Sequence, residues 1–373
     1  MRRLGDAGDT GDAGTARDDG GVAEKNSGRR PAAPCRRTVL GLAGALTASL
    51  TAPRAAAAPR RLPAQDPPGP QAPAAEAPFD LSLPSTRWIA EKPLHHTTVM
   101  QSFGFDESRR HIYAVQLISG GVQLPGESRA YTHAERSLAG DLCMNRLSWD
   151  GTLLDRMYLK GFGHGTVMAV EDARADSGPV TLWTECDANP VSGYGRAIGR
   201  FPYAAGTVLH STDPAVSLHW ALPGTTNNTA ALDQDSRRLL LRYAIGGFRR
   251  YALFDLDAFT AGRYVRRADF AQPGTELALP FQGMTLHGDY AYQMLGHSHD
   301  PDSPPPDRGD TLLYCIDVRT GEVVQQVRSD TVYALNLREP EGLAVLRSEG
   351  PRLCMGYASG PVGARKLSVY TLE

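Results

Sequence analysis

Short apolar segments separated by turns follow one another from residue 79 to the end of the chain. Four of these segments are rich in β-branched and aromatic side chains, which favours strands: His111–Leu117, Val180–Thr184, Leu239–Tyr243 and Tyr290–Leu295. Patterns with the 3.6-residue period of an amphipathic helix are scarce. Many short strands with frequent turn signals indicate an all-β domain that is a sandwich, a barrel or a propeller.

One short motif returns about every sixty residues and decides between these architectures. It consists of a polar residue, a small residue and then an apolar strand. We call the polar members the anchor residues: Gln101, His164, Asn228, Gln282 and Glu341, which lie 63, 64, 54 and 59 residues apart. The small residues directly after them are Ser102, Gly165, Thr229, Gly283 and Gly342. Five such units of roughly four antiparallel strands predict a five-bladed β-propeller over residues 79–373.

The ends of this domain predict how the ring closes. The last unit, residues 339–373, has room for only about three strands. The segment Thr86–Ala90 is available as the missing outer strand, so we expect an N-terminal strand to close the propeller.

The first 78 residues differ sharply in composition. Arg36 and Arg37 precede the apolar run 41–50 and the small-residue stretch 55–58, a pattern typical of a secretory signal and similar to a twin-arginine signal. We therefore expect residues 1–58 to be a removable signal peptide and the chain to be secreted. Residues 59–78 carry seven prolines, which favours a disordered, extended linker.

Charge and length exclude several classes of partner. The chain has 39 Lys and Arg against 41 Asp and Glu, so it lacks the cation excess of a general nucleic-acid binder. Residues 1–58 carry a net charge of +3, which leaves −5 on residues 59–373. No later stretch is apolar and long enough for a transmembrane helix, so no membrane insertion is expected after signal cleavage. We expect a monomer.

The anchor residues are the first candidates for binding. In a propeller the innermost strands begin around one opening, and five polar groups there suit a ligand rich in hydroxyl groups. A structural role, in which the anchors bond to one another or to water, is the alternative. Four further candidates flank them: His96 in a His-His pair, Glu185 beside Trp183, and Tyr194 and Arg196 in a glycine-rich loop.

Other chemistry is less well supported. His297 and His299 alternate before Asp300, but no third metal ligand is identifiable, so neither a metal site nor a cofactor is predicted. Phosphate-binding loops, dinucleotide fingerprints and serine-nucleophile motifs are missing from the sequence. The cysteines of the predicted domain are either disulfide-bonded or free and buried: Cys143, Cys186, Cys315 and Cys354.

Several segments together resemble a known family. They are Leu94–Asp106, Tyr158–Gly165, Trp183–Glu185, Glu339–Gly342 and Met355–Gly360. The set is similar to the β-propeller family that includes teichoic acid biosynthesis protein C and receptor-binding or baseplate proteins of phages of Gram-positive bacteria. The resemblance implies a propeller fold and an association with cell-wall or other extracellular glycans.

Two functions fit this resemblance. The first is a polysaccharide lyase-like enzyme, in which His96 and His164 transfer protons during β-elimination beside a uronate and the other candidates bind substrate. A glycoside hydrolase is less favoured, because only Glu341 is a carboxylate at an anchor position. The second is a non-catalytic protein that binds wall teichoic acid or another cell-wall glycan. We expect His96 and His164 to converge beside an Arg or amide in the first case only.

Overall fold

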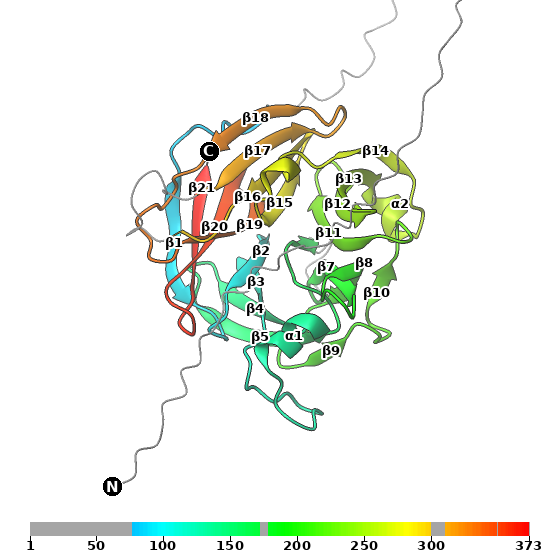
Figure 1. Ribbon diagram of the computed structural model, residues 1–373, viewed down its shortest axis with the longest axis vertical. Coiled ribbons are helices and arrows are strands. Elements are labelled where there is room, and N and C mark those ends of the chain that lie inside the picture. Colours follow the sequence, from blue (N-terminus) through cyan, green and yellow to red (C-terminus); the bar gives the residue numbers. More distant parts are fainter. Residues whose placement is uncertain (1–76, 172–177, 300–309, 349, 373) are drawn as a thin grey trace, which may run out of the picture. The chain divides into compact units, whose positions relative to one another are not determined.

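Five β-sheets stand around a common axis, each with one strand innermost (Figure 1). The computed structural model describes residues 77–171, 178–299, 310–348 and 350–372, which belong to the compact unit Ala74–Glu373. The expected signal peptide and nearly all of the expected linker lie outside the described residues and stay predictions. The five-bladed all-β fold expected from the motif spacing is confirmed.

Each blade takes its strands in order from the centre outwards. Blade 1 comprises β2 (Met100–Asp106), β3 (His111–Leu117), β4 (Leu142–Ser148) and β5 (Leu153–Lys160), with β9 (Val208–His210) parallel to β5. Blade 2 comprises β6 (Met168–Glu171), β7 (Thr181–Ala188), β8 (Gly195–Pro202) and β10 (Ser217–His219). Blade 3 comprises β11 (Thr226–Asp233), β12 (Arg238–Ile245), β13 (Phe248–Asp255) and β14 (Arg266–Ala271). Blade 4 comprises β15 (Phe281–His287), β16 (Tyr290–Leu295), β17 (Leu312–Asp317) and β18 (Val323–Arg328).

Blade 5 is built from both ends of the domain. It comprises β19 (Glu339–Leu346), β20 (Arg352–Ser359), β21 (Lys366–Leu372) and, outermost, β1 (Thr86–Pro93). Strand β1 pairs antiparallel with β21, from Thr86 opposite Thr371 to Pro93 opposite Lys366. Ile89 of β1 is buried in the apolar cluster that contains Leu367 and Val369. The N-terminal strand therefore closes the ring, as the short last unit predicts.

The inner strands form a closed circle of neighbours. Strand β2 contacts β6, β6 contacts β11, β11 contacts β15, β15 contacts β19, and β19 contacts β2. Since every blade repeats the same strand order, all the inner strands begin at one end of the propeller axis and finish at the other. We call the two ends the N-terminal mouth and the C-terminal mouth.

Helices are few and short among the described residues. They are α1 (His133–Ala139), α2 (Leu256–Thr260) and the 3₁₀ turn η1 (Thr275–Leu277). A reciprocal pair of hydrogen bonds between Thr132 and Glu135 begins α1, and Gly140 ends it with a φ of 68°. None of the described helices is long and apolar enough to span a membrane.

Candidate functional site

The small residues behind the anchors let the inner strands meet at the axis. A β-carbon added to Gly342 would lie 2.9 Å from the Cα of Ser102, and one added to Gly283 would lie 2.8 Å from the Cα of Gly342. Ser102 Oγ donates to the carbonyl of Gly165 at 2.6 Å. The crowding that the sequence predicts at the axis is therefore present in these blades.

Four anchors lie at irregularities of the strand ladder. The register between inner and second strands shifts at Gln101, Asn228, Gln282 and Glu341. Such bulges turn a side chain out of the normal alternation. All four side chains are at most 9% exposed, so the bulges place polar groups deep at the N-terminal mouth.

These four buried groups differ in their hydrogen bonding. Gln282 Nε2 donates to the carbonyl of Gly296 at 2.7 Å, and Asn228 Nδ2 donates to the carbonyl of Arg196 at 2.5 Å. Asn228 Oδ1 accepts no hydrogen bond from the described residues. The side chains of Gln101 and Glu341 likewise make none within the described part of the chain. Gln101 and Glu341 thus keep hydrogen-bonding capacity that a ligand can use, whereas Asn228 Oδ1 is sealed from solvent.

The fifth anchor, His164, departs from the predicted pattern. The sequence motif places it at the start of an inner strand, but β6 begins four residues later, at Met168. The carboxylate of Glu185 accepts hydrogen bonds from the backbone N–H groups of Gly165 and Thr166 at 2.6 and 3.1 Å. These donors are then not available to a strand ladder, so His164 lies in a loop.

Glu185 itself supports this loop instead of facing a ligand. Its side chain is fully buried, and its second oxygen accepts from the N–H of Gly195 at 2.7 Å. The ring of half-buried His164 lies 5.0 Å from that of Tyr194, centroid to centroid. Desolvation lowers the pKa of His164, against the opposing charge of Glu185. A neutral imidazole and a phenol therefore lie side by side at the N-terminal mouth.

Arg196 is placed differently from the other candidates. It is exposed, and its guanidinium pairs with the carboxylate of Asp187 at 2.7 Å. The side chain thus lies on a hairpin surface and has a counter-charge already.

The predicted histidine pair occupies a polar pocket of blade 1. His95 Nε2 lies 3.1 Å from the hydroxyl of Tyr158, and the two histidine rings are 4.7 Å apart, centroid to centroid. Burial, helped by the charges of His95 and Arg156, lowers the pKa of His96 to about 4. His96 Nε2 has no hydrogen-bond partner among the described residues. His96 is therefore neutral at physiological pH, with one ring nitrogen unused.

The rings of His96 and His164 have different neighbours. His96 contacts His95 and Tyr158, whereas His164 contacts Tyr194, and within the described residues the two rings do not touch each other. His96 precedes the inner strand of blade 1, and His164 precedes that of blade 2.

Blade 5 contributes a pair of carboxyl groups. Burial raises the pKa of Glu341 well above its usual value, and the nearby carboxyl of Glu339 raises it further. Burial also raises the pKa of Glu339, although Arg365 pairs with it at 3.2 Å. Glu341 can therefore act as a neutral hydrogen-bond donor at this mouth.

One residue of the mouth is missing from the sequence-based candidates. Arg242 lies in the apolar strand β12 opposite Thr229, the small residue after the Asn228 anchor, and is 5% exposed. The sequence contains one sign of this residue, which is an arginine inside the apolar run Leu239–Tyr243. A cation is rarely buried in an apolar strand unless it is paired or binds a ligand.

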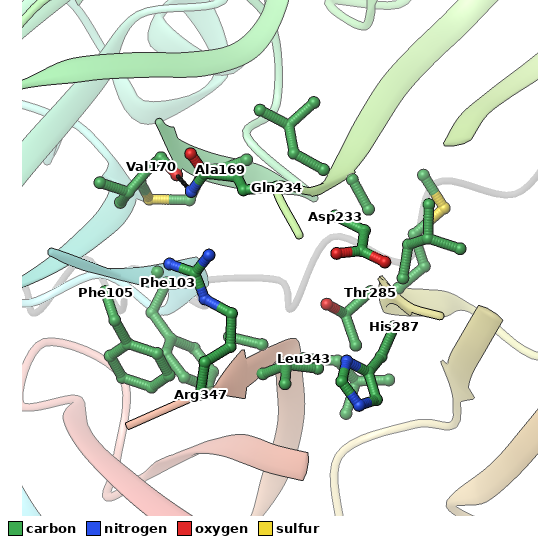
Figure 2. A pocket seen from close by; sticks show the side chains of 18 of the residues that line it. Phe103, Phe105, Ala169, Val170, Asp233, Gln234, Thr285, His287, Leu343 and Arg347 are labelled. Atoms are coloured by element: carbon green, nitrogen blue, oxygen red, sulfur yellow. Dashed lines mark hydrogen bonds between the residues drawn. The ribbon is translucent and has the colours of Figure 1, made fainter. Parts of the chain in front are cut away.

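The opposite mouth offers less to a ligand. A cavity of about 60 Å³ opens there between the ends of the inner strands, with Phe103 in its wall (Figure 2). Asp233 on its rim accepts from the N–H of Gly288 at 2.9 Å, and Arg347 reaches Glu107 at 3.4 Å. Because these charged groups of the rim are already paired within the protein, we place the candidate site at the N-terminal mouth.

Metal and disulfide chemistry is not supported by these residues. His297 Nδ1 lies 2.7 Å from Asp310, while Asp300 lies outside the described residues. Within the described residues no group of three possible metal ligands occurs. The cysteines of the domain are free and buried: Cys143, Cys186, Cys315 and Cys354.

Known proteins resemble this chain over most of the propeller. A curated protein of Bacillus subtilis (strain 168), putative major teichoic acid biosynthesis protein C, is 27% identical over 309 residues, which are 78% of this chain and 63% of that protein. The tail fiber of Staphylococcus aureus phage P68 shares the fold with a TM-score of 0.60 and 18% identity, over 79% of this chain and 54% of that one. The chain thus spans less than two thirds of either relative. Residues 99–371 match the model of the phage five-bladed β-propeller receptor-binding platform domain, and the chain belongs to that family.

Proposed function

We propose that the protein is a non-catalytic binder of a cell-wall glycan of the teichoic acid class, and that the N-terminal mouth of the propeller is its binding site. The observation that carries the proposal is the set of buried polar groups there with unused hydrogen-bonding capacity. They are the side chains of Gln101 and Glu341. No polar atom of these two side chains is among the buried atoms without a partner, so both side chains reach solvent and can form hydrogen bonds with a ligand.

The chemistry of these groups suits polyols and sugars. An amide and a protonated carboxyl group each donate or accept hydrogen bonds without carrying charge. Each can therefore bind a hydroxyl group without the cost of desolvating an ion. The relatives support this ligand class, since one carries teichoic acid in its name and the family model describes a phage receptor-binding domain.

An elimination reaction is less well supported by the same geometry. A lyase needs a base and an acid that act on one sugar residue, together with a group that neutralises the uronate. Within the described residues the rings of His96 and His164 do not contact each other, and each packs against a different tyrosine. Binding requires no such convergence.

Sedimentation with purified Gram-positive cell walls tests the proposal. We expect the protein to sediment with intact walls and to stay in solution with walls from which teichoic acid has been chemically removed. Gln101→Ala should weaken binding about fivefold, the effect of one hydrogen bond. Gln326→Ala, on the exposed outer strand β18, should leave binding unchanged.

The lyase hypothesis is tested on the same preparation. Incubation with a panel of uronate polymers should produce no ultraviolet absorbance from unsaturated uronate ends. Absorbance that grows with time, or equal sedimentation with both kinds of wall, would contradict the binding proposal.

A further inference from the structure

Arg242 differs from the other deeply buried arginines in that neither of its terminal guanidinium nitrogens donates a hydrogen bond within the described residues. Arg136 is fully buried between two carboxylates, Glu127 at 2.5 Å and Asp141 at 2.8 Å. Arg338 is buried without a carboxylate, but all three of its side-chain nitrogens donate hydrogen bonds, to Thr331, Thr311 and Ser329. These two side chains follow the rule that a buried cation is paired or saturated.

Arg242 follows neither pattern. Its Nε donates to Gln272 Oε1 at 2.7 Å, and its guanidinium lies 3.9 Å above the ring centroid of Phe281. These contacts fix the plane of the group. Within the described residues no carboxylate lies at ion-pair distance, and neither Nη1 nor Nη2 donates a hydrogen bond. Neither nitrogen is among the buried atoms without a partner, so both remain within reach of solvent.

Arg242 belongs to a blade with more arginines than carboxylates. Residues 226–271, which form blade 3, contain eight arginines and five aspartates, whereas residues 59–373 together carry −5. Burial lowers the pKa of Arg242 to about 10, and the charge of Arg249 adds to this effect. Arg242 therefore stays charged at neutral pH, although no carboxylate of the described residues lies at ion-pair distance from it.

The position of Arg242 connects it with the candidate glycan site. Its register partner Thr229 lies directly after the anchor Asn228, and Phe281 precedes the anchor Gln282. Tyr194 and Glu185 of blade 2 are close enough to influence its charge. The guanidinium nitrogens Nη1 and Nη2 of Arg242 thus lie at the N-terminal mouth.

We propose that Arg242 is the anion-binding residue of this mouth and that it receives a phosphodiester group of the bound polymer. A phosphodiester keeps one negative charge and two non-bridging oxygens, which match the two free guanidinium nitrogens. Its flanking polyol or sugar hydroxyls are then in range of the neutral anchors. This inference rests on the proposed function, since it names the group by which the polymer is selected.

The test compares three variants of the same strand and mouth. Arg242→Gln removes the charge, Arg242→Lys keeps the charge without the planar fork, and Arg238→Gln removes an arginine of β12 that pairs with Asp289 at 3.0 Å near the C-terminal mouth. Titration uses purified glycerol-phosphate teichoic acid at several salt concentrations. We expect Arg242→Gln to bind about 10- to 100-fold more weakly and with a smaller salt dependence. Arg242→Lys should retain part of the affinity, and Arg238→Gln should bind like the wild type.

A small probe separates failure of this inference from failure of the proposed function. Glycerophosphoglycerol, an isolated phosphodiester, should shift the guanidinium nitrogen signals of Arg242 in NMR spectra, even if the protein does not bind walls. Wall binding that is equal in the wild type and Arg242→Gln overturns the inference and leaves the proposed function intact. The inference is also overturned if the probe causes no shift, or if polygalacturonate binds more tightly than teichoic acid through Arg242.

Discussion

At the scale of single residues, the N-terminal mouth contains two kinds of buried polar group. Glu185 represents the first kind, because both of its oxygens accept from backbone N–H groups of two loops. Gln101 and Arg242 represent the second, because they are also buried, at 9% and 5% exposed, but keep unused donors or acceptors. The first kind holds the loops in place, and the second is available to a ligand.

Glu185→Gln should therefore lower the stability of the folded protein and not only its affinity for the glycan. An amide in place of the carboxylate turns an NH₂ group toward at least one backbone donor, at Gly165 or Gly195. We expect the free energy of unfolding to fall by roughly 2–4 kcal/mol, measured in urea. Glu322→Gln, at an exposed turn, is the matched control and should be neutral. If both variants unfold at the same urea concentration, the structural role of Glu185 is wrong.

At the scale of elements, the small residue after each anchor determines how closely the inner strands approach one another. Gly342 has a φ of 82°, and a β-carbon there would meet the backbone of Ser102 at 2.9 Å. Gly363 has the same φ of 82°, but no atom lies within 4 Å of its β-carbon position. A comparison of alanine substitutions at these two glycines therefore separates two losses of unfolding free energy, one from the left-handed backbone conformation and one from crowding at the axis.

Gly363→Ala should lower the free energy of unfolding by about 1–2 kcal/mol, the cost of a left-handed conformation. Gly342→Ala carries the same cost and adds a clash between blades, so we expect a loss of about 2–5 kcal/mol. Thermal unfolding of both variants measures the difference. Equal losses would mean that the inner strands have room to separate.

The sequence predicts the bounds of an element well where nearby residues determine them. It predicts them poorly where a side chain distant in the sequence determines them. The closing strand is expected from the length of the last unit, and it is present. The start of β6 is not expected, because Glu185, twenty residues away, binds the amides ahead of it. Arg242 was missed for a similar reason. Its lack of a counter-charge depends on which blades meet around it, and no local pattern encodes this.

At the scale of the whole molecule, buried histidines couple folding to pH. His219 of blade 2 stacks on Trp183 at 5.5 Å, and burial, helped by the charge of Arg200, lowers its pKa to about 4. His96 is lowered to a similar value in blade 1. Both rings take up protons near pH 6.5 in the unfolded chain but only near pH 4 in the native state. The unfolded chain thus binds more protons in this window, so native stability falls as pH drops from 6.5 toward 4.

The raised pKa values of Glu339 and Glu341 have the opposite effect on stability. Protonation of these carboxyl groups below neutral pH removes a buried charge, so their contribution to native stability rises as pH falls. A comparison of variants isolates the histidine contribution from these carboxyl groups. His219→Phe preserves the stack on Trp183 and removes the titrating group. Between pH 7.5 and pH 5 the wild type should lose roughly 2 kcal/mol more unfolding free energy than this variant, measured by urea unfolding at each pH. Parallel pH profiles would show that His219 is protonated equally in both states. Because His219 lies away from the N-terminal mouth, glycan binding by the folded variant should not change.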